Sequence, residues 1–270
     1  MTEPETSKNV VQSLAKGFSV MEAFTSDEPE LVLAEIARRA GLDNGTTFRL
    51  LNTLVMLGYV ERVEGSRRFR LTLKCLELGF NAIARSDLRT RARPVLRGLV
   101  GEMNEAASIG VLEGAEVVYI ERMQAGMTRL GVDVRIGSRV PVHSTAIGHA
   151  IVSFLPRDDQ ERILAAAPRR KVTDKTVTGV RSLLQRFKEV RARGYAVSDQ
   201  ENVPGLCVLA APIVGADGLP IAGLSVAAPA FRMSAQAFAK AGAGPLLEAA
   251  RVLSRGLNAA GGFALHSTHA

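Results

Sequence analysis

The first 72 residues contain three consecutive segments with the apolar spacing of amphipathic helices, followed by two short segments that alternate in the strand period. The helical segments span residues 10–24, 31–40 and 45–57. Gly41 and Gly58 directly follow the second and third of them, as expected of residues that end a helix. The alternating segments, 59–63 and 68–72, lie around a turn with Gly65 and predict a hairpin. Three short helices and a hairpin permit very few folds.

This order of elements predicts a winged helix-turn-helix, in which the third helix enters a major groove and the hairpin lies over the flanking backbone of DNA. Asp43 or Asn44 is a natural N-cap for the third helix. The polar side chains that we expect at its groove-facing end are those of Asn44, Thr46, Thr47 and Arg49. The helix also carries the apolar residues Phe48, Leu50, Leu51, Leu54 and Leu57, and the leucines are expected to hold it to its own core.

The positive charge of the chain is concentrated on this predicted turn, helix and wing. The whole chain has a net charge of +7, yet its first 80 residues carry slightly more acidic than basic side chains. Residues 38–74 alone hold eight Lys and Arg against three Asp and Glu. The arginines expected to neutralise phosphates are Arg62, Arg67 and Arg68, with Arg70 as a further candidate. Gly45 offers no side chain and would allow close approach of a phosphate to the backbone. The alternative is a solvated arginine-rich hairpin in a protein that binds no DNA.

Several classes of protein are excluded by simpler features. The two cysteines, Cys75 and Cys207, are 132 positions apart without a neighbouring ligand cluster, so neither a disulfide framework nor a zinc site is predicted. No motif predicts a cofactor or a metal. The N-terminus lacks the pattern of a signal peptide, and no apolar run approaches the ~18–20 residues that span a bilayer. We therefore expect a cytoplasmic protein without a membrane partner.

The rest of the chain predicts an α+β module behind a long helical stretch. We expect a DNA-binding domain at residues 1–80, a linker helix at 81–101 that Pro94 breaks, an α+β domain at 102–258 and a flexible tail at 259–270. The strands are predicted at residues 108–112, 117–122, 129–134, 206–214 and 220–227. The helices are predicted at residues 145–155, 160–166, 180–193 and 235–257.

The chain resembles the IclR family of bacterial transcriptional regulators over almost its whole length. The resemblance rests on the runs at residues 11–17, 33–42, 49–54, 57–60, 136–141, 143–148, 194–201 and 205–212. It implies that the second domain is a GAF/PAS-like module for a small effector and that the protein binds promoter DNA as a dimer or dimer of dimers. Among these relatives, the first run with Phe18 and the run at 136–141 are most similar to regulators of aromatic-acid catabolism. The expected effector is thus an aromatic carboxylate such as protocatechuate or 4-hydroxybenzoate, and the alternative is an aliphatic acid such as glyoxylate or pyruvate.

The resemblance and the side-chain chemistry together predict an effector site. The residues that match the effector pocket of the family are Thr145, Ala146, Ile147, Ser198, Asp199, Cys207, Val208 and Ser225. Ser144 and Thr145 before an apolar run also predict a helix N-terminus that suits a carboxylate. The candidates that could pair with an anion are Arg122 and Arg139, and His143 is a further candidate. Whether Cys207 or Val208 faces the pocket stays open, since the cysteine is one place out of the family's register.

Two further classes of function compete with a regulator. Ser225, Cys207, His143 and Asp199 could supply a nucleophile with its base in a small-acid enzyme, but no nucleophile elbow or phosphate loop accompanies them. A ligand-binding protein with a vestigial DNA domain is the other alternative. The sequence favours a regulator that is not an enzyme, because a cavity with few polar residues and no activating context binds more readily than it catalyses.

Overall fold

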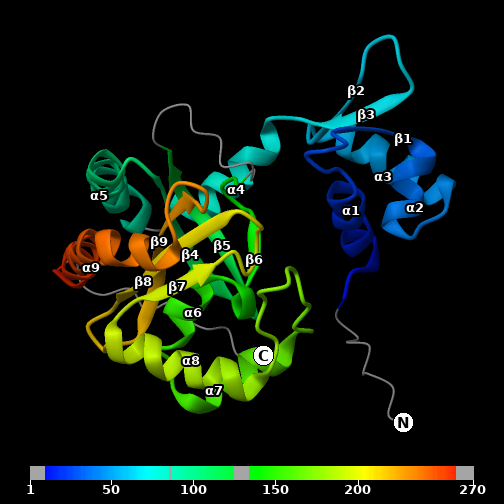
Figure 1. The fold of residues 1–270 in the computed structure, drawn as a ribbon. Helices are drawn as coiled ribbons and strands as arrows, with labels where there is room; N and C mark the ends of the chain where they lie inside the picture. Colours follow the sequence, from blue (N-terminus) through cyan, green and yellow to red (C-terminus); the bar gives the residue numbers. More distant parts are fainter. Residues whose placement is uncertain (1–9, 85–86, 125–133, 260–270) are drawn as a thin grey trace. The chain divides into compact units, whose positions relative to one another are not determined.

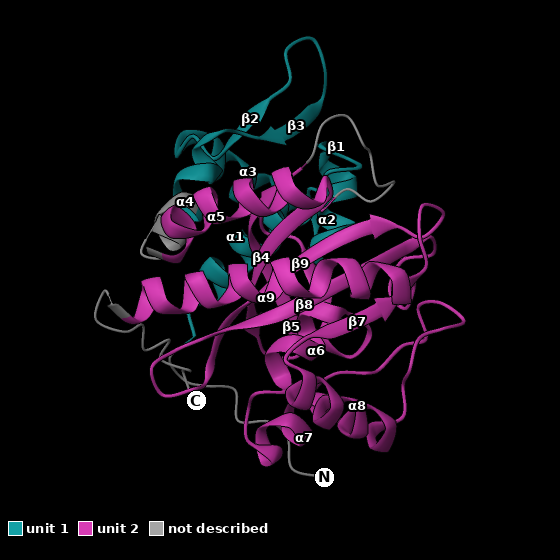
Figure 2. Ribbon diagram, turned by 60° about the vertical axis from the view of Figure 1, so that its left-hand side comes forward, with its two compact units in different colours: residues 1–85 teal, residues 86–270 magenta. Residues whose placement is uncertain are grey.

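The computed structural model describes residues 10–84, 87–124 and 134–259. The chain forms two compact units, unit 1 at residues 1–85 and unit 2 at residues 86–270 (Figure 2). None of the described helices is both long enough and apolar enough to cross a membrane.

Unit 1 contains four helices and a small antiparallel sheet among its described residues. In chain order the elements are α1 (Gln12–Glu22), β1 (Glu30–Val32), α2 (Leu33–Ala40), α3 (Asn44–Met56), β2 (Val60–Arg62), β3 (Arg68–Leu71) and α4 (Lys74–Ala84). The strand order is β1-β3-β2. This is a winged helix-turn-helix, with α2 and α3 as the two helices of the motif and β2 and β3 as the wing.

Local signals in the sequence explain how α2 and α3 end and begin. Gly41 follows α2 in the left-handed conformation, with a φ of 65°, which glycine adopts without steric cost. Asp43 caps α3, since its side chain accepts a hydrogen bond of 2.8 Å from the backbone N–H of Thr46. That bond lowers the pKa of the Asp43 carboxyl group. The core of unit 1 then closes over fully buried side chains from three helices, Val20, Ile36 and Leu51.

Two features of unit 1 differ from the sequence predictions. Leu31 lies in β1, which pairs with β3, because the segment before α2 completes the wing sheet through backbone hydrogen bonds that its apolar spacing did not reveal. Val10, just before α1, and Leu14 and Phe18 within it are exposed, and the buried residue of this helix is Val20. The predicted spacing was present, but it marks a face that the unit leaves uncovered.

Unit 2 is a six-stranded antiparallel sheet with helices on both faces (Figure 1). Its helices are α5 (Asp87–Met103), the 3₁₀ turn η1 (Val142–Ser144), α6 (Ala146–Val152), α7 (Arg157–Ala166), α8 (Val180–Arg193) and α9 (Ala235–Ala259). Its strands are β4 (Ala106–Glu113), β5 (Glu116–Met123), β6 (Arg139–Pro141), β7 (Ala196–Asp199), β8 (Leu206–Val214) and β9 (Pro220–Pro229). They lie in the order β6-β5-β4-β9-β8-β7. The architecture is α+β, as the sequence predicts.

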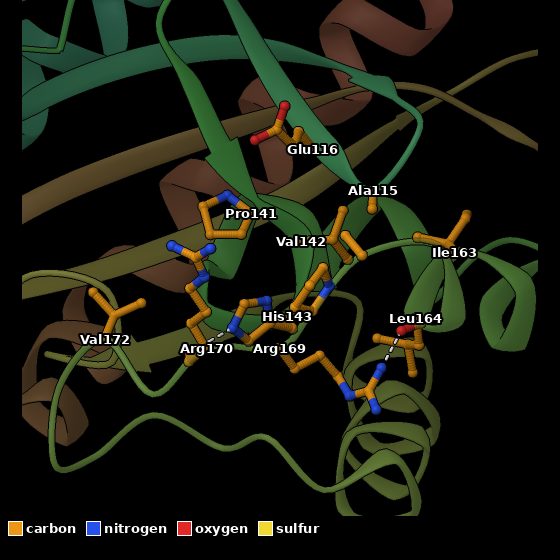
Figure 3. A pocket seen from close by; sticks show the side chains of 12 residues that line it. Ala115, Glu116, Pro141, Val142, His143, Ile163, Leu164, Arg169, Arg170 and Val172 are labelled. Atoms are coloured by element: carbon orange, nitrogen blue, oxygen red, sulfur yellow. Dashed lines mark hydrogen bonds between the residues drawn. The ribbon is translucent and has the colours of Figure 1, made fainter.

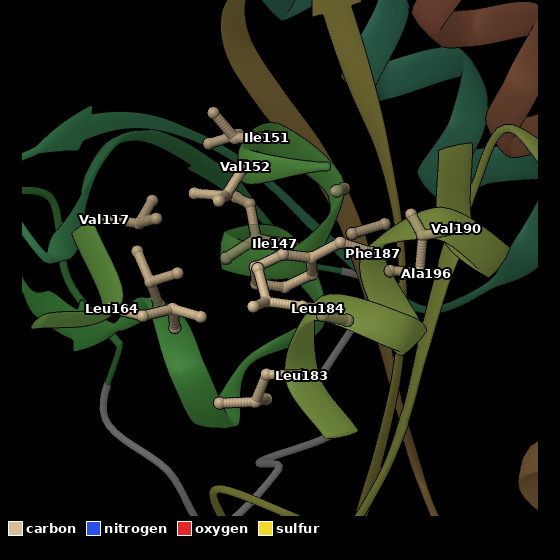
Figure 4. Packing of buried hydrophobic residues seen from close by; sticks show 14 of the residues in the cluster. Val117, Ile147, Ile151, Val152, Leu164, Leu183, Leu184, Phe187, Val190 and Ala196 are labelled. Carbon is tan, nitrogen blue, oxygen red and sulfur yellow. The ribbon is translucent and has the colours of Figure 1, made fainter. Parts of the chain in front are cut away.

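Glycines let α6 approach the sheet closely. A Cβ on Gly110 in β4 would lie 2.9 Å from a side-chain atom of Ile147, and a Cβ on Gly223 in β9 would lie 2.6 Å from another. These two glycines are direct partners in adjacent strands, so they form a shallow floor beneath the helix. The core on this side continues from α6 to α7 and α8, where Phe187 is fully buried (Figure 4). The helices α5 and α9 pack on the other face, where α9 reaches Leu209 of β8.

Several bounds in unit 2 differ from the predictions. Pro94 lies inside α5 without ending it, and the short strands β6 and β7 were not predicted. Three-residue and four-residue strands contain too few positions to show a period. The predicted strand at 129–134 falls almost wholly on residues outside those described, as does the tail after residue 259.

Candidate functional site

The exposed face of α3 presents polar side chains at its N-terminal half. Asn44 and Arg49 are exposed, and Thr46 is half-buried with its hydroxyl 3.5 Å from a guanidinium nitrogen of Arg49. Asn52, one turn further along the helix, is also exposed, and its Oδ1 accepts a hydrogen bond of 2.9 Å from Arg62 of the wing. Asn52 was not among the predicted candidates, although its spacing of eight residues from Asn44 places it near the same side of the helix.

Thr47 corrects a prediction. Its side chain is 0 % exposed, and its hydroxyl donates a hydrogen bond of 2.8 Å to the backbone carbonyl of Asp43. A side chain enclosed in the core of unit 1 cannot reach a base or a phosphate. Phe48 shows the reverse: this apolar side chain is 44 % exposed, whereas Leu51 and Leu54 are buried. The helical period alone did not separate these neighbours, because Thr and Phe are both tolerated at a boundary between core and surface.

The wing carries exposed arginines that differ in how far their charge is neutralised. Arg62 lies over the ring of Phe69, 5.4 Å from its centroid, and Arg68 donates to the backbone carbonyl of Glu30 at 2.9 Å. Neither contact cancels the positive charge, and Arg67 is exposed at the turn. Arg70 is different because it forms ion pairs with Glu61 at 2.5 Å and with Glu30 at 3.5 Å.

In unit 2, a row of cross-strand partners on the face of the sheet that carries α6 brings two serines beside an arginine. Arg122, Ser108 and Ser225 are successive cross-strand partners on β5, β4 and β9, and Ala210 of β8 follows Ser225. Residues directly opposite each other in an antiparallel pair lie on the same face. Since Ser108 and Gly110 alternate on one side of β4, this row faces the same side as α6.

The row is held together by hydrogen bonds around one guanidinium group. Nη1 of Arg122 donates to Oγ of Ser108 at 3.1 Å, and the phenol of Tyr119 lies near the side chain of Ser225, which partly offsets the effect of burial on its pKa. Burial raises the pKa of Tyr119, so its hydroxyl stays protonated at neutral pH. Ser108 and Ser225 are themselves buried. A guanidinium group beside buried hydroxyl groups is chemically suited to a carboxylate.

The neighbouring row settles the orientation of the residues after Gly205. Val208 is opposite both Ala227 and Ser198, so these three side chains lie on the face of α6. Cys207 and Asp199 are opposite each other and therefore lie on the other face. Burial and the nearby Asp199 carboxylate raise the pKa of the Cys207 thiol to about 11, and Lys175 pairs with Asp199 at 2.7 Å. The strand period thus places Cys207 and Asp199 on the opposite face of the sheet from Ser198, Val208 and Ser225, so the structure does not bring them together with those candidates.

Arg139 also lies elsewhere than predicted. Its guanidinium group forms hydrogen-bonded ion pairs of 2.8 Å with Glu113 and of 2.8 Å with Glu116, at the turn between β4 and β5. That turn is at the opposite end of β5 from Arg122. Two carboxylates already balance the charge of Arg139, and the structure does not bring this residue to the serine row.

His143 lines a separate cavity of about 340 Å³ at the edge of the sheet (Figure 3). Its Nε2 donates to the backbone carbonyl of Arg170 at 2.9 Å, and its own carbonyl accepts a hydrogen bond of 2.8 Å from the ring of His149. The cavity also contacts apolar side chains such as Val142 and Leu164. His143 therefore fixes the 3₁₀ turn before α6, and its ring does not lie with the serine row.

The predicted helix start at α6 is present but short. Thr145 is its N-cap, accepting from the backbone N–H of Gly148 at 3.3 Å and donating to the carbonyl of Pro141 at 2.8 Å. Ala146 and Ile147 are buried, and Ile147 packs on the glycine floor. Since α6 has seven residues, we expect it to contribute by packing side chains such as Ile147 on the glycine floor rather than by a strong helix dipole.

The arrangement required for nucleophilic catalysis is not assembled from the residues considered for it. Ser225 lies under α6, Cys207 lies on the other face, and His143 lines the edge cavity. A nucleophile and its base need hydrogen-bond contact. Among the described residues, no group of His, Cys, Asp and Glu is placed to hold a metal ion.

A winged helix-turn-helix and a separate α+β unit are the architecture of a two-domain DNA-binding transcriptional regulator. Two family models match: the IclR helix-turn-helix domain at residues 13–64 and the bacterial transcriptional regulator IclR C-terminal domain at residues 80–255. The chain belongs to the IclR family.

Three relatives show the range of this likeness. The HTH-type transcriptional regulator KdgR of Escherichia coli is 34 % identical over 224 residues, which cover 83 % of this chain and 84 % of KdgR. The Pca regulon regulatory protein of Pseudomonas putida is 32 % identical, with 79 % and 73 % covered. The crystal structure of an IclR homologue from Microbacterium hydrocarbonoxydans complexed with 4-hydroxybenzoate has a TM-score of 0.80 at 26 % identity, over 92 % of this chain and 99 % of that one.

Proposed function

We propose that the protein is a cytoplasmic regulator, without enzymatic activity, that binds a promoter through α3 and the wing and responds to a small organic acid bound beneath α6. The observation that carries the effector site is the row formed by Arg122, Ser108 and Ser225, in which one guanidinium group lies among buried hydroxyls. Ligand binding there can alter promoter affinity only if the protein has two conformations that differ in their affinity for DNA and also in their affinity for the ligand.

The DNA contacts of the proposal follow from exposure and charge. On α3 they are Asn44, Thr46 and Arg49, with Asn52 added from the structure. On the wing they are Arg62, Arg67 and Arg68. Asn and Arg can form bidentate hydrogen bonds to base edges. The wing arginines would instead neutralise phosphates, which raises the affinity for any DNA sequence in a salt-dependent way.

The preferred effector is an aromatic carboxylate such as protocatechuate or 4-hydroxybenzoate. The homologue complexed with 4-hydroxybenzoate supports this class. Ser225 and Tyr119 lie on the same face of the sheet as Arg122 and could hydrogen-bond a ring hydroxyl. Val208 and Ser198 lie on this face further across the sheet, on β8 and β7, and remain candidates for contact with the rest of the ligand. A short aliphatic acid is the alternative, because a carboxylate alone is sufficient to pair with a guanidinium group.

Thermal-shift measurements with four acids test the effector class. A ligand at 100 times its Kd stabilises the unit that binds it by about 2.7 kcal/mol. We expect a rise in Tm with protocatechuate or 4-hydroxybenzoate, and a response to glyoxylate or pyruvate alone would show that the aromatic class is wrong. Arg122→Ala should abolish the rise, whereas Arg139→Ala is the matched control, because that arginine lies with Glu113 and Glu116 at the other end of β5.

A gel-shift titration on the intergenic DNA upstream of the coding sequence tests the DNA-binding surface. Arg49→Ala should weaken binding by about tenfold, since a good bidentate contact is worth about 1–3 kcal/mol. Arg70→Ala is the control, because two carboxylates already neutralise that guanidinium group. Equal losses from both variants would show that α3 is not the reading element.

We also propose that the protein associates with a second copy through α1. Val11, Leu14 and Phe18 are each more than half exposed and lie on one side of the helix. An exposed apolar stripe of this kind is typical of a surface covered in an assembly. Leu14→Glu should shift the molar mass measured by light scattering from that of a dimer or tetramer toward that of a monomer, whereas the exposed Met56→Glu should not.

A further inference from the structure

Phe48 is an apolar side chain on the face of α3 that the proposed function turns toward DNA. It is 44 % exposed and lies outside the core cluster of unit 1, whereas its near neighbours Leu50 and Leu51 pack in or against that cluster. The helix therefore holds itself to the core without Phe48. Leaving this ring in water costs free energy that a partner could recover.

The surroundings of Phe48 indicate what kind of partner covers it. Asn44 and Asn52 lie one turn before and one turn after it on the helix, and Arg49 is its exposed neighbour. Arg62 reaches this surface from the wing, where it donates to Asn52. The ring thus has amide and guanidinium groups among its exposed neighbours on α3 and the wing.

Such a mixture is complementary to the edge of base pairs in a major groove. Amides and guanidinium groups can meet the hydrogen-bonding edges, and the surrounding phosphates are anionic. The one large apolar group that a major groove presents is the C5-methyl of thymine. A protein partner would instead be expected to cover a contiguous apolar surface.

We propose that Phe48 determines part of the DNA sequence preference by packing on the C5-methyl group of a thymine. This inference rests on the proposed DNA-binding function. Gly45 lies three residues before Phe48, on the same side of α3, and has no side chain, so the first turn of the helix presents little bulk to the DNA on this side. The N-terminal half of α3 can then approach the groove floor closely enough for the ring to reach a base.

Thymine-to-uracil replacement tests the contact, because it removes only the methyl group. A duplex is first selected from a randomised library with the full-length protein, and each thymine of that duplex is then replaced singly by uracil. For the wild-type protein we expect one replacement per half-site to weaken binding about fourfold, the value of one buried methylene-sized group.

The same scan on variants identifies the side chain responsible. Phe48→Ala should bind the original and the replaced duplex equally, and Phe48→Leu should retain part of the discrimination. Met56→Ala is the matched control, since this residue is an exposed apolar side chain near the other end of α3 and should leave the uracil response unchanged. Circular dichroism and Tm confirm that the variants are folded.

The possible outcomes separate this inference from the function on which it rests. If the protein selects a duplex but no uracil replacement weakens its binding, or if Phe48→Ala shows the same uracil response as the wild type, the contact is refuted and DNA binding stands. If Phe48→Ala lowers the molar mass of the free protein and the uracil response is absent, a second copy covers the ring instead. If no duplex is retained even at low salt, both the function and the contact are refuted.

Discussion

The two candidate sites of this protein are built in opposite ways. In unit 1 the side chains that would meet DNA, such as Asn44, Arg49 and Arg67, are exposed on a helix and a wing around a small core. In unit 2 the candidate effector residues Ser108 and Ser225 are buried in the sheet as cross-strand partners, and Ser108 accepts a hydrogen bond from Arg122.

This difference follows from the size and solvation of the two kinds of partner. A DNA duplex is a large polyanion that must approach from outside, so the side chains that meet it can stay hydrated until contact. A small acid gains affinity when it is surrounded, so its partners must be desolvated and held in place beforehand. We therefore expect unit 1 to tolerate changes at its site and unit 2 to lose stability when its site is altered.

The largest expected effect comes from the core that supports the DNA-binding surface. Leu51→Ala removes a fully buried side chain from α3, so it should destabilise unit 1 by about 2–5 kcal/mol. Hydrogen exchange should then show faster amide exchange in α1 to α3 with little change in β4, β8 and β9. Equal acceleration in both units would contradict their independence. Arg49→Ala provides the comparison, since changing that exposed side chain should leave exchange unaltered.

A smaller effect is expected when the floor beneath α6 is filled. Gly223→Val places side-chain atoms where a Cβ alone would lie 2.6 Å from Ile147, so it should destabilise unit 2 by about 1–3 kcal/mol and weaken effector binding. Thermal unfolding with and without 4-hydroxybenzoate measures both effects. Gly244→Val on α9 is a comparison substitution, since nothing lies within 4 Å of its Cβ position. If 4-hydroxybenzoate raises the Tm of Gly223→Val as much as that of the wild type, the glycine floor is not part of the effector site.

Acid should destabilise unit 2 through a buried histidine. Burial lowers the pKa of His149 to about 3, from an ordinary value near 6.5. The folded protein thus binds this proton less readily than the unfolded chain, so the stabilising contribution is complete above about pH 6.5 and is lost as the pH falls from there toward 3. The ring resonances of His149, assigned by their loss in His149→Gln, should not titrate between pH 8 and 5. A midpoint near 6.5 would show that the ring is hydrated.

The smallest expected effect concerns a single phosphate contact on the wing. Arg67→Ala should leave the stability of unit 1 unchanged, because the side chain is exposed at the hairpin turn. It should weaken binding to different duplexes nearly equally and lower the slope of log K against log salt by about one. Fluorescence anisotropy at several salt concentrations measures this slope. A loss confined to one DNA sequence would mean that Arg67 reads bases.

The sequence was most informative where function depends on local structure. The helix periods, Gly41, the cap at Asp43 and the concentration of arginines predicted the winged helix-turn-helix, and their physical causes act within a few residues. The wrong prediction for Thr47 arose at the same helix, since the boundary between core and surface depends on how α3 rotates against α1 and α2. In unit 2 the family resemblance supplied candidates, but it did not determine on which face of the sheet each one lies.

By itself the sequence determined that the chain contains a winged helix-turn-helix followed by an α+β module, because apolar periods, caps and turns are local properties. The IclR family was indicated by the resemblance of its sequence runs. The tertiary structure decided which candidates share a site. A strand turns alternate side chains to opposite faces, so one position of register places Val208 beneath α6 and Cys207 on the other side. Cross-strand pairing likewise brought Arg122 to Ser108 and Ser225, and it paired Arg139 with two glutamates at the far end of β5. Such pairings join residues that are distant in the chain, and the local periods of the sequence do not encode them.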